Sequence, residues 1–172
     1  MNCYYVEGGS GKDNYQKLIR YMIAYSDSFS LTYFRYNRIE RLKRTAKRIK
    51  EKLEPYKLYA KETTHLPSME TLNENNHIYE LTVYRSCKQV IPVLEELDSL
   101  WQWDYPHYPM DLCFFKSGFA WFISSAHEEY AILYTEDSGV VNDLRDIGFT
   151  LIEDHTAEPD ELFFAVQSTG DG

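Results

Sequence analysis

The sequence lacks the features of a secreted, membrane-spanning or disulfide-stabilised protein. No stretch approaches the roughly 18 consecutive apolar residues of a membrane-spanning helix. The N-terminal residues have no basic region followed by an apolar run, which a signal peptide would need. The cysteines, Cys3, Cys87 and Cys113, are odd in number and widely spaced, which argues against a disulfide framework. We therefore expect a cytoplasmic protein that does not bind membranes.

Sequence motifs for common catalytic and cofactor chemistry are also missing. The five histidines show none of the spacings typical of zinc sites, and the acidic residues between 153 and 161 lack the pattern of a calcium loop. No serine lies in a G-x-S-x-G motif. The turn at residues 8–12 departs from a phosphate-binding loop, because Val6 replaces its first glycine and Asp13 its Ser or Thr. We predict no metal site and no cofactor, and no catalytic residue can be assigned.

Enough apolar side chains are present to form a full hydrophobic core. Of the 172 residues, 44% are hydrophobic and 16% are aromatic. A chain of this length removes about 70% of its surface from water when it folds. We therefore predict one α+β domain over residues 1–172. The polar, proline-containing segment 65–76 is the best candidate for an internal boundary if the chain forms two halves.

The spacing of apolar residues predicts the order of the elements. We expect helices that begin after residue 12, that span 38–54, that carry Val90, Leu94, Leu97 and Trp101 on one face, and that begin at Asp137 or Ser138 and end at Gly148. Pro92 would kink the third helix if it began at Ser86, so a start near Pro92 is the alternative. Segments of strand composition are residues 3–6, 29–36, 56–63, 78–84, 111–115, 119–124, 130–134, 150–152 and 162–166.

Three of these predicted strands, between residues 111 and 134, follow one another with short turns and predict an antiparallel meander. The predicted fold class is therefore α+β, with a mixed, mostly antiparallel sheet and about four helices packed on it.

Charge is distributed unevenly along the chain. The formal net charge is −9. Residues 35–57 carry ten Lys or Arg against three Glu, a net charge of +7, whereas residues 58–172 carry five basic against 21 acidic residues, a net charge of −16. The first 34 residues are balanced, with three of each sign. Such asymmetry bears on the choice of partner rather than on the fold.

The predicted helix 38–54 combines a basic surface with a narrow apolar seam, which consists of Ile39, Leu42, Ala46, Ile49 and Leu53. Its basic patch could contact phosphates of a nucleic acid, an acidic protein partner or the acidic second half of this same chain, or it could be a solvated face. The negative charge of the whole chain argues against a nucleic acid, because the long-range field would repel phosphates. The patch consists of Arg38, Arg41, Arg44, Lys47 and Arg48.

An aromatic, proline-interrupted segment after residue 100 is the best candidate for contact with a partner. Large aromatic side chains often supply most of the affinity of a protein interface, and acidic residues steer a basic partner toward it. The same aromatic side chains could instead fill the edge of the core. The candidate contact residues are Trp101, Trp103, Asp104, Tyr105, Tyr108, Glu128 and Glu129.

These features favour a non-catalytic, acidic protein-binding domain, such as an adaptor, an inhibitor or an immunity-type protein. Its partner would be another protein, and a partner with a basic surface would suit the acidic charge of this domain. The first alternative is a small-molecule-binding or enzymatic domain whose site is assembled from scattered residues. The second alternative is nucleic-acid binding through the basic helix 38–54.

Overall fold

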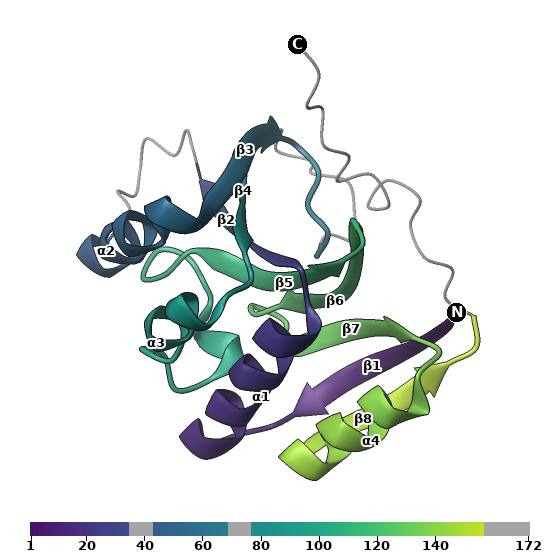
Figure 1. Cartoon of the computed structure of the whole chain (residues 1–172). Helices are drawn as coiled ribbons and strands as arrows, with labels where there is room; N and C mark the ends of the chain where they lie inside the picture. The colour runs from purple at the N-terminus through teal and green to yellow at the C-terminus, as the bar shows by residue number, and fades with distance from the viewer. Residues whose placement is uncertain (35–42, 69–76, 157–172) are drawn as a thin grey trace.

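A single eight-stranded sheet dominates the protein, whose computed structural model describes residues 1–34, 43–68 and 77–156 (Figure 1). The strand order is β3-β4-β2-β5-β6-β7-β1-β8. Every pairing of neighbouring strands is antiparallel, so the sheet described is antiparallel rather than mixed. The strands are β1 (Asn2–Gly8), β2 (Ser28–Phe34), β3 (Lys57–Thr63), β4 (Tyr79–Arg85), β5 (Met110–Lys116), β6 (Phe119–Ser125), β7 (Tyr130–Thr135) and β8 (Phe149–Asp154).

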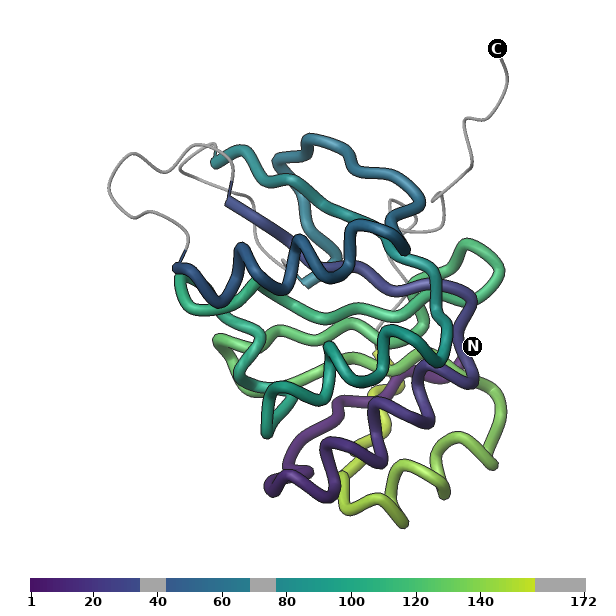
Figure 2. Tube along the Cα trace, turned by 60° about the vertical axis from the view of Figure 1, so that its left-hand side comes forward, coloured from purple at the N-terminus to yellow at the C-terminus, as the bar shows by residue number. Residues whose placement is uncertain are grey.

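Four α-helices cover one face of this sheet. They are α1 (Lys12–Tyr25), α2 (Arg44–Leu53), α3 (Ile91–Leu94) and α4 (Ser138–Ile147). Figures 1 and 2 show them in the spatial order α2, α3, α1, α4, and neighbours in this order contact one another. Apolar side chains from all four helices join one core with strand residues of a single alternation, such as Val6, Phe29 and Phe114. Residues of the other alternation, including Cys3, Cys113 and Ile123, form a second, smaller cluster.

The predicted α+β class and the predicted meander are confirmed. The sheet, with eight strands, is a larger part of the fold than the prediction of helices packed on a sheet suggests. β5, β6 and β7 pair in sequence. The fourth predicted helix is also found. Asp137 accepts a hydrogen bond from Gly139 N–H (2.8 Å), and Gly148 ends α4 in the left-handed conformation at a φ of 114°. These are the cap and the terminating residue that the sequence predicts.

The third predicted helix does not form as one element. The chain instead makes a 3₁₀ turn, η2 (Lys88–Val90), the four-residue α3, and a second 3₁₀ turn, η3 (Leu100–Gln102). Pro92 lies in the first turn of α3, where its missing N–H costs no helical hydrogen bond. Val90, Leu94 and Leu97 are nevertheless all buried. The apolar spacing therefore predicted the burial of these three residues correctly, whereas Trp101, the fourth, is half-buried. The alternative start near Pro92 agrees with the first residue of α3, but the helix ends after four residues.

Some predictions concern residues that the structure does not describe. The basic residues Arg38 and Arg41 and the predicted strand 162–166 lie outside the described residues, as does most of the segment 65–76. What is described of that segment lies in the connection between β3 and β4, which pair with each other. Within the described part of the chain, no helix has both the length and the apolar character needed to cross a membrane.

Candidate functional site

The aromatic segment, residues 101–109, is anchored in the core by Trp103. This side chain is fully buried, and its indole N–H donates to the Tyr15 hydroxyl (2.9 Å). Tyr15 in turn donates to the carbonyl of Leu94 (2.7 Å), and burial raises the pKa of this tyrosine. The prediction that Trp103 contacts a partner is therefore wrong. Its apolar rings fill the core, and Tyr15 satisfies its polar atom.

The other aromatic residues of this segment are half-buried. Trp101 donates its indole N–H to the carbonyl of Gly8 (3.2 Å), so it contacts the turn before α1. Tyr105 packs edge-on against Phe34 (4.7 Å between ring centroids), and Tyr108 packs against Trp103 (6.4 Å). Asp104, Tyr105 and Tyr108 thus keep part of their surface in water, while contacts with the core hold the segment that carries them.

The N-terminus of the basic helix lies directly against this aromatic segment. The N–H of Lys43 donates to the carbonyl of Pro106 (3.2 Å). The hydroxyl of Thr45 donates to the carbonyl of His107 (2.5 Å). Two groups of candidate residues that are about 60 positions apart in sequence therefore meet in the folded protein. Arg44 and Lys47, both exposed, belong to the same end of α2.

The turn between β6 and β7 also approaches the aromatic segment, and this turn carries acidic side chains. His127 Nδ1 lies 3.9 Å from Asp104 Oδ2, and Glu128 and Glu129 follow it with exposed side chains. Basic, aromatic and acidic groups are thus linked through one segment. We call this set the bipolar surface; it consists of Arg44, Lys47, Asp104, Tyr105, Tyr108, His127, Glu128 and Glu129.

Most of the remaining charges on α2 bind acidic residues of the same chain. Arg48 and Lys52 both pair with Glu96, at 2.8 and 2.5 Å, and Lys50 pairs with Glu80 at 2.5 Å. The sequence left four possible roles for the basic helix. For these three cations, the role is contact with the acidic second half of the same chain. Arg44 and Lys47 have no ion-pair partner within the described residues.

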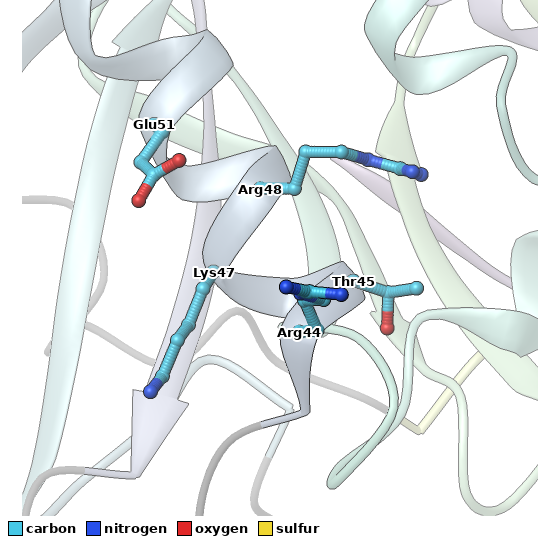
Figure 3. A pocket seen from close by; sticks show the side chains of 5 residues that line it. All are labelled: Arg44, Thr45, Lys47, Arg48 and Glu51. Atoms are coloured by element: carbon cyan, nitrogen blue, oxygen red, sulfur yellow. The ribbon is translucent and has the colours of Figure 1, made fainter.

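A shallow groove of about 440 Å³ runs along the outer side of α2 (Figure 3). Figure 3 shows the side chains of Arg44, Lys47 and Arg48 spreading from the helix without converging on one point. A small anion needs several donors aimed at a single position. The groove is therefore better suited to an extended contact with another macromolecule than to one small anion. Its lining residues are Arg44, Thr45, Lys47, Arg48 and Glu51.

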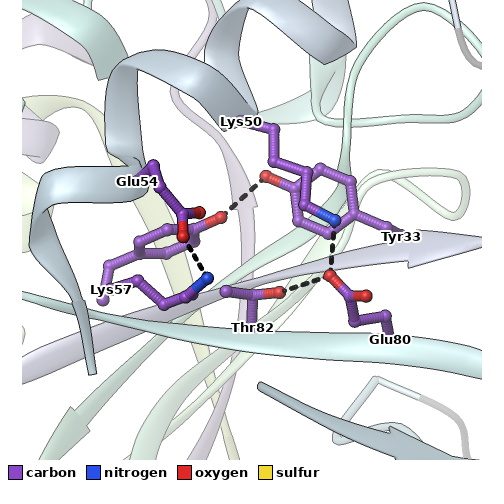
Figure 4. Close-up of polar contacts among 7 residues, drawn as sticks. Tyr33, Lys50, Glu54, Lys57, Glu80 and Thr82 are labelled. Atoms are coloured by element: carbon purple, nitrogen blue, oxygen red, sulfur yellow. Dashed lines mark hydrogen bonds and ion pairs between the residues drawn. The ribbon is translucent and has the colours of Figure 1, made fainter. Parts of the chain in front are cut away.

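The inner side of α2 is fastened to the sheet by a polar network (Figure 4). The hydroxyls of Tyr33 and Tyr84 are 2.9 Å apart, and Lys50 Nζ lies 4.6 Å from the centre of the Tyr33 ring. Thr82 donates to the same Glu80 oxygen that binds Lys50. Burial raises the pKa of Tyr84 to about 12 and raises that of Tyr33 as well. The two hydroxyls are buried and lie within hydrogen-bonding distance of each other, which favours a structural role for the network.

No pattern in the sequence points to Asp111, a buried carboxylate beneath the bipolar surface. Its two oxygens accept from the Ser68 hydroxyl (2.5 Å) and from Ala126 N–H (3.0 Å). Its own N–H donates to the carbonyl of Trp103 (3.0 Å). Burial raises its pKa to about 6, although these two accepted hydrogen bonds act in the opposite direction. Its partners come from distant segments, so no local pattern could have revealed the role of Asp111.

Within the described residues, no group of three or more His, Cys, Asp or Glu side chains is arranged to hold a metal ion. Comparison of the chain with protein-family models, with curated proteins and with solved structures finds no match. Function is therefore inferred from geometry and charge.

Proposed function

We propose that this protein acts without catalysis, by binding another protein through the bipolar surface. The observation that carries the proposal is the contact of the aromatic segment with the N-terminus of α2, joined to the 3.9 Å approach of His127 to Asp104. These contacts bring exposed charges of both signs together around half-buried tyrosines. With the cytoplasmic location expected from the sequence, the partner would be another cytoplasmic protein.

Several physical features support a protein partner. Half-buried tyrosines offer large, rigid contact area at a low cost in conformational entropy. Trp103 and Asp111 hold the segment that carries Tyr105 and Tyr108, so less ordering is needed when a partner docks. Charges of both signs favour a partner with a basic region facing Glu128 and Glu129 and an acidic region facing Arg44 and Lys47.

Nucleic-acid binding through α2 receives less support. Three of the helix's cations bind Glu96 and Glu80. Phosphates drawn to Arg44 and Lys47 would also meet the carboxylates of Asp104, Glu128 and Glu129. Binding to DNA or RNA with a steep inverse dependence on salt concentration would favour this second candidate over ours.

Charge reversal at the acidic turn tests the proposal. The partner is first captured by crosslinking in the source cell and identified, and its affinity for the purified protein is then measured. We expect Glu128→Lys/Glu129→Lys to weaken binding by at least about tenfold, mainly through slower association. The matched control is Asp143→Lys/Asp146→Lys, which reverses two exposed acids on α4. Equal affinity of the wild-type protein and both double variants for the partner would refute the proposal.

A further inference from the structure

A second, separate cavity of about 270 Å³ lies at one end of the interior strands β5, β6 and β7, beside the last turn of α1. Its large side chains are aromatic: Tyr25 from the last turn of α1, Phe119 and Trp121 from β6, and Tyr134 from β7. Lys116, Thr135, Glu136 and Met1 complete the lining. None of these residues belongs to the bipolar surface.

The aromatic walls are held in position by contacts with one another and with residues outside the cavity. The indole N–H of Trp121 donates to the Ser26 hydroxyl (3.0 Å), and the ring centroids of Tyr25 and Trp121 are 4.8 Å apart. Tyr25 also stacks on Tyr21 at an interplanar angle of 9°. On the other side, Phe119 packs against Tyr134. A ligand would therefore meet preformed walls, which lowers the cost of binding.

Charge in the cavity favours an anionic ligand. Lys116 Nζ lies 3.4 Å from the centre of the Tyr25 ring and has no carboxylate partner within the described residues. The carboxylate of Glu136 is 3.2 Å from the terminal ammonium of Met1, so this negative charge is already compensated. Lys116 is the one cationic side chain among the described residues that line the cavity. A carboxylate at the mouth could pair with Lys116 while its ring contacts the aromatic walls.

We propose that this cavity binds a small planar aromatic carboxylate. An apolar cavity of about 150 Å³ is known to hold benzene, so 270 Å³ leaves room for one ring or two fused rings with a carboxylate group. The walls supply contact with the ring faces, and Lys116 supplies the charge that selects the anion. This binding would be independent of the protein partner proposed above.

The test follows the indole N–H signal of Trp121 by ¹H–¹⁵N NMR while a ligand is titrated. Indole-2-carboxylate is the anionic probe, indole the neutral one, and phenyltrimethylammonium the cationic one. We expect indole-2-carboxylate to shift the Trp121 signal saturably and to leave the signal of the buried Trp103 in place. Lys116→Met should weaken this binding by about tenfold, the effect of losing one charged hydrogen-bond donor, and should leave the affinity for indole unchanged.

Lys88→Met is the matched control, because Lys88 is an exposed lysine that does not line the cavity. It should bind all three probes as the wild-type protein does. The proposal is overturned if indole-2-carboxylate causes no saturable shift of Trp121, or if Lys116→Met binds it as tightly as the wild type. Tighter binding of phenyltrimethylammonium than of the carboxylate would also overturn it, because the cavity would then be a cation site.

Discussion

Trp103 and Asp111 meet through the backbone, since the Asp111 N–H donates to the Trp103 carbonyl. Both side chains are buried, yet each holds a segment that carries exposed residues of the bipolar surface. Trp103 holds the segment with Asp104 and Tyr105, and Asp111 holds the turn that begins at Ala126. At the scale of single residues, the surface therefore depends on groups that a partner would not touch.

Truncation of Trp101 and of Trp103 should lower the free energy of unfolding by different amounts, because only Trp103 is fully buried. Trp103→Ala removes a fully buried side chain and should lower the free energy of unfolding by about 3–5 kcal/mol. Trp101→Ala should lower it by only about 1–2 kcal/mol, because part of the Trp101 side chain is already in water. Urea-induced unfolding measures both values. Equal losses for the two variants would contradict the difference in burial between the two side chains.

The titration of Asp111 should make stability depend on pH in a defined direction. Burial raises its pKa to about 6 from an ordinary value of 3.8. As the pH rises between these two values, the unfolded chain loses this proton while the folded protein keeps it. The contribution of Asp111 to stability therefore falls over this interval and is constant above it.

Asp111→Asn should remove this dependence and keep both contacts. Its amide oxygen can accept from Ala126 N–H, and its amide nitrogen can donate to Ser68 Oγ. We expect the free energy of unfolding of Asp111→Asn, relative to wild type, to increase by about 2–3 kcal/mol between about pH 4 and about pH 7. Urea unfolding at a series of pH values measures this difference. A difference that stays constant with pH would show that the pKa of Asp111 is not raised.

The element with the strongest division between core and surface is α2. Ala46, Ile49 and Leu53 are fully buried, as the predicted seam requires, while the cations on the other sides of the helix are exposed or paired. Ile39 and Leu42, the first two residues of that seam, lie outside the described residues. Within the described residues, the side chains of Ala46, Ile49 and Leu53 supply the apolar contacts that join the helix to the core.

Substitutions on the two sides of α2 should therefore have very different effects. Ile49→Ala should lower the free energy of unfolding by about 2–5 kcal/mol, the range for truncating a buried aliphatic side chain. Lys47→Ala, on the exposed side, should change it by less than about 0.5 kcal/mol. Thermal or urea unfolding of the two variants provides the comparison. A large loss for Lys47→Ala would reveal a contact of its ammonium group that the described residues do not show.

The elements also show which features can be predicted from sequence. The strands of the meander and helix α4 follow from local alternation, a capping aspartate and a terminal glycine, which act within a few residues. The segment around Pro92 has a helical spacing of apolar residues, but three short turns bury the same side chains. Asp111 and the contact of Thr45 with His107 depend on residues brought together only by the fold. Local patterns contain no information about such contacts.

In the whole molecule, charges that are separated along the chain come into contact. Glu80 and Glu96 belong to the acidic part of the sequence, and they bind three cations of the basic segment. The contrast of +7 and −16 along the sequence is therefore reduced on the folded surface near α2. Arg44 and Lys47, which have no ion-pair partner among the residues that the structure describes, form the basic half of the bipolar surface.

The position of β1 has a consequence for synthesis on the ribosome. β1 is translated first, yet it lies between β7 and β8, which are translated last among the described strands. Its backbone hydrogen-bonding groups have no sheet partner until the chain has reached β7, about 130 residues later. Such long-range pairing is slow to form. The nascent chain must therefore hold an apolar strand unpaired while the residues between β1 and β7 are made, and chaperones would be most needed during this interval.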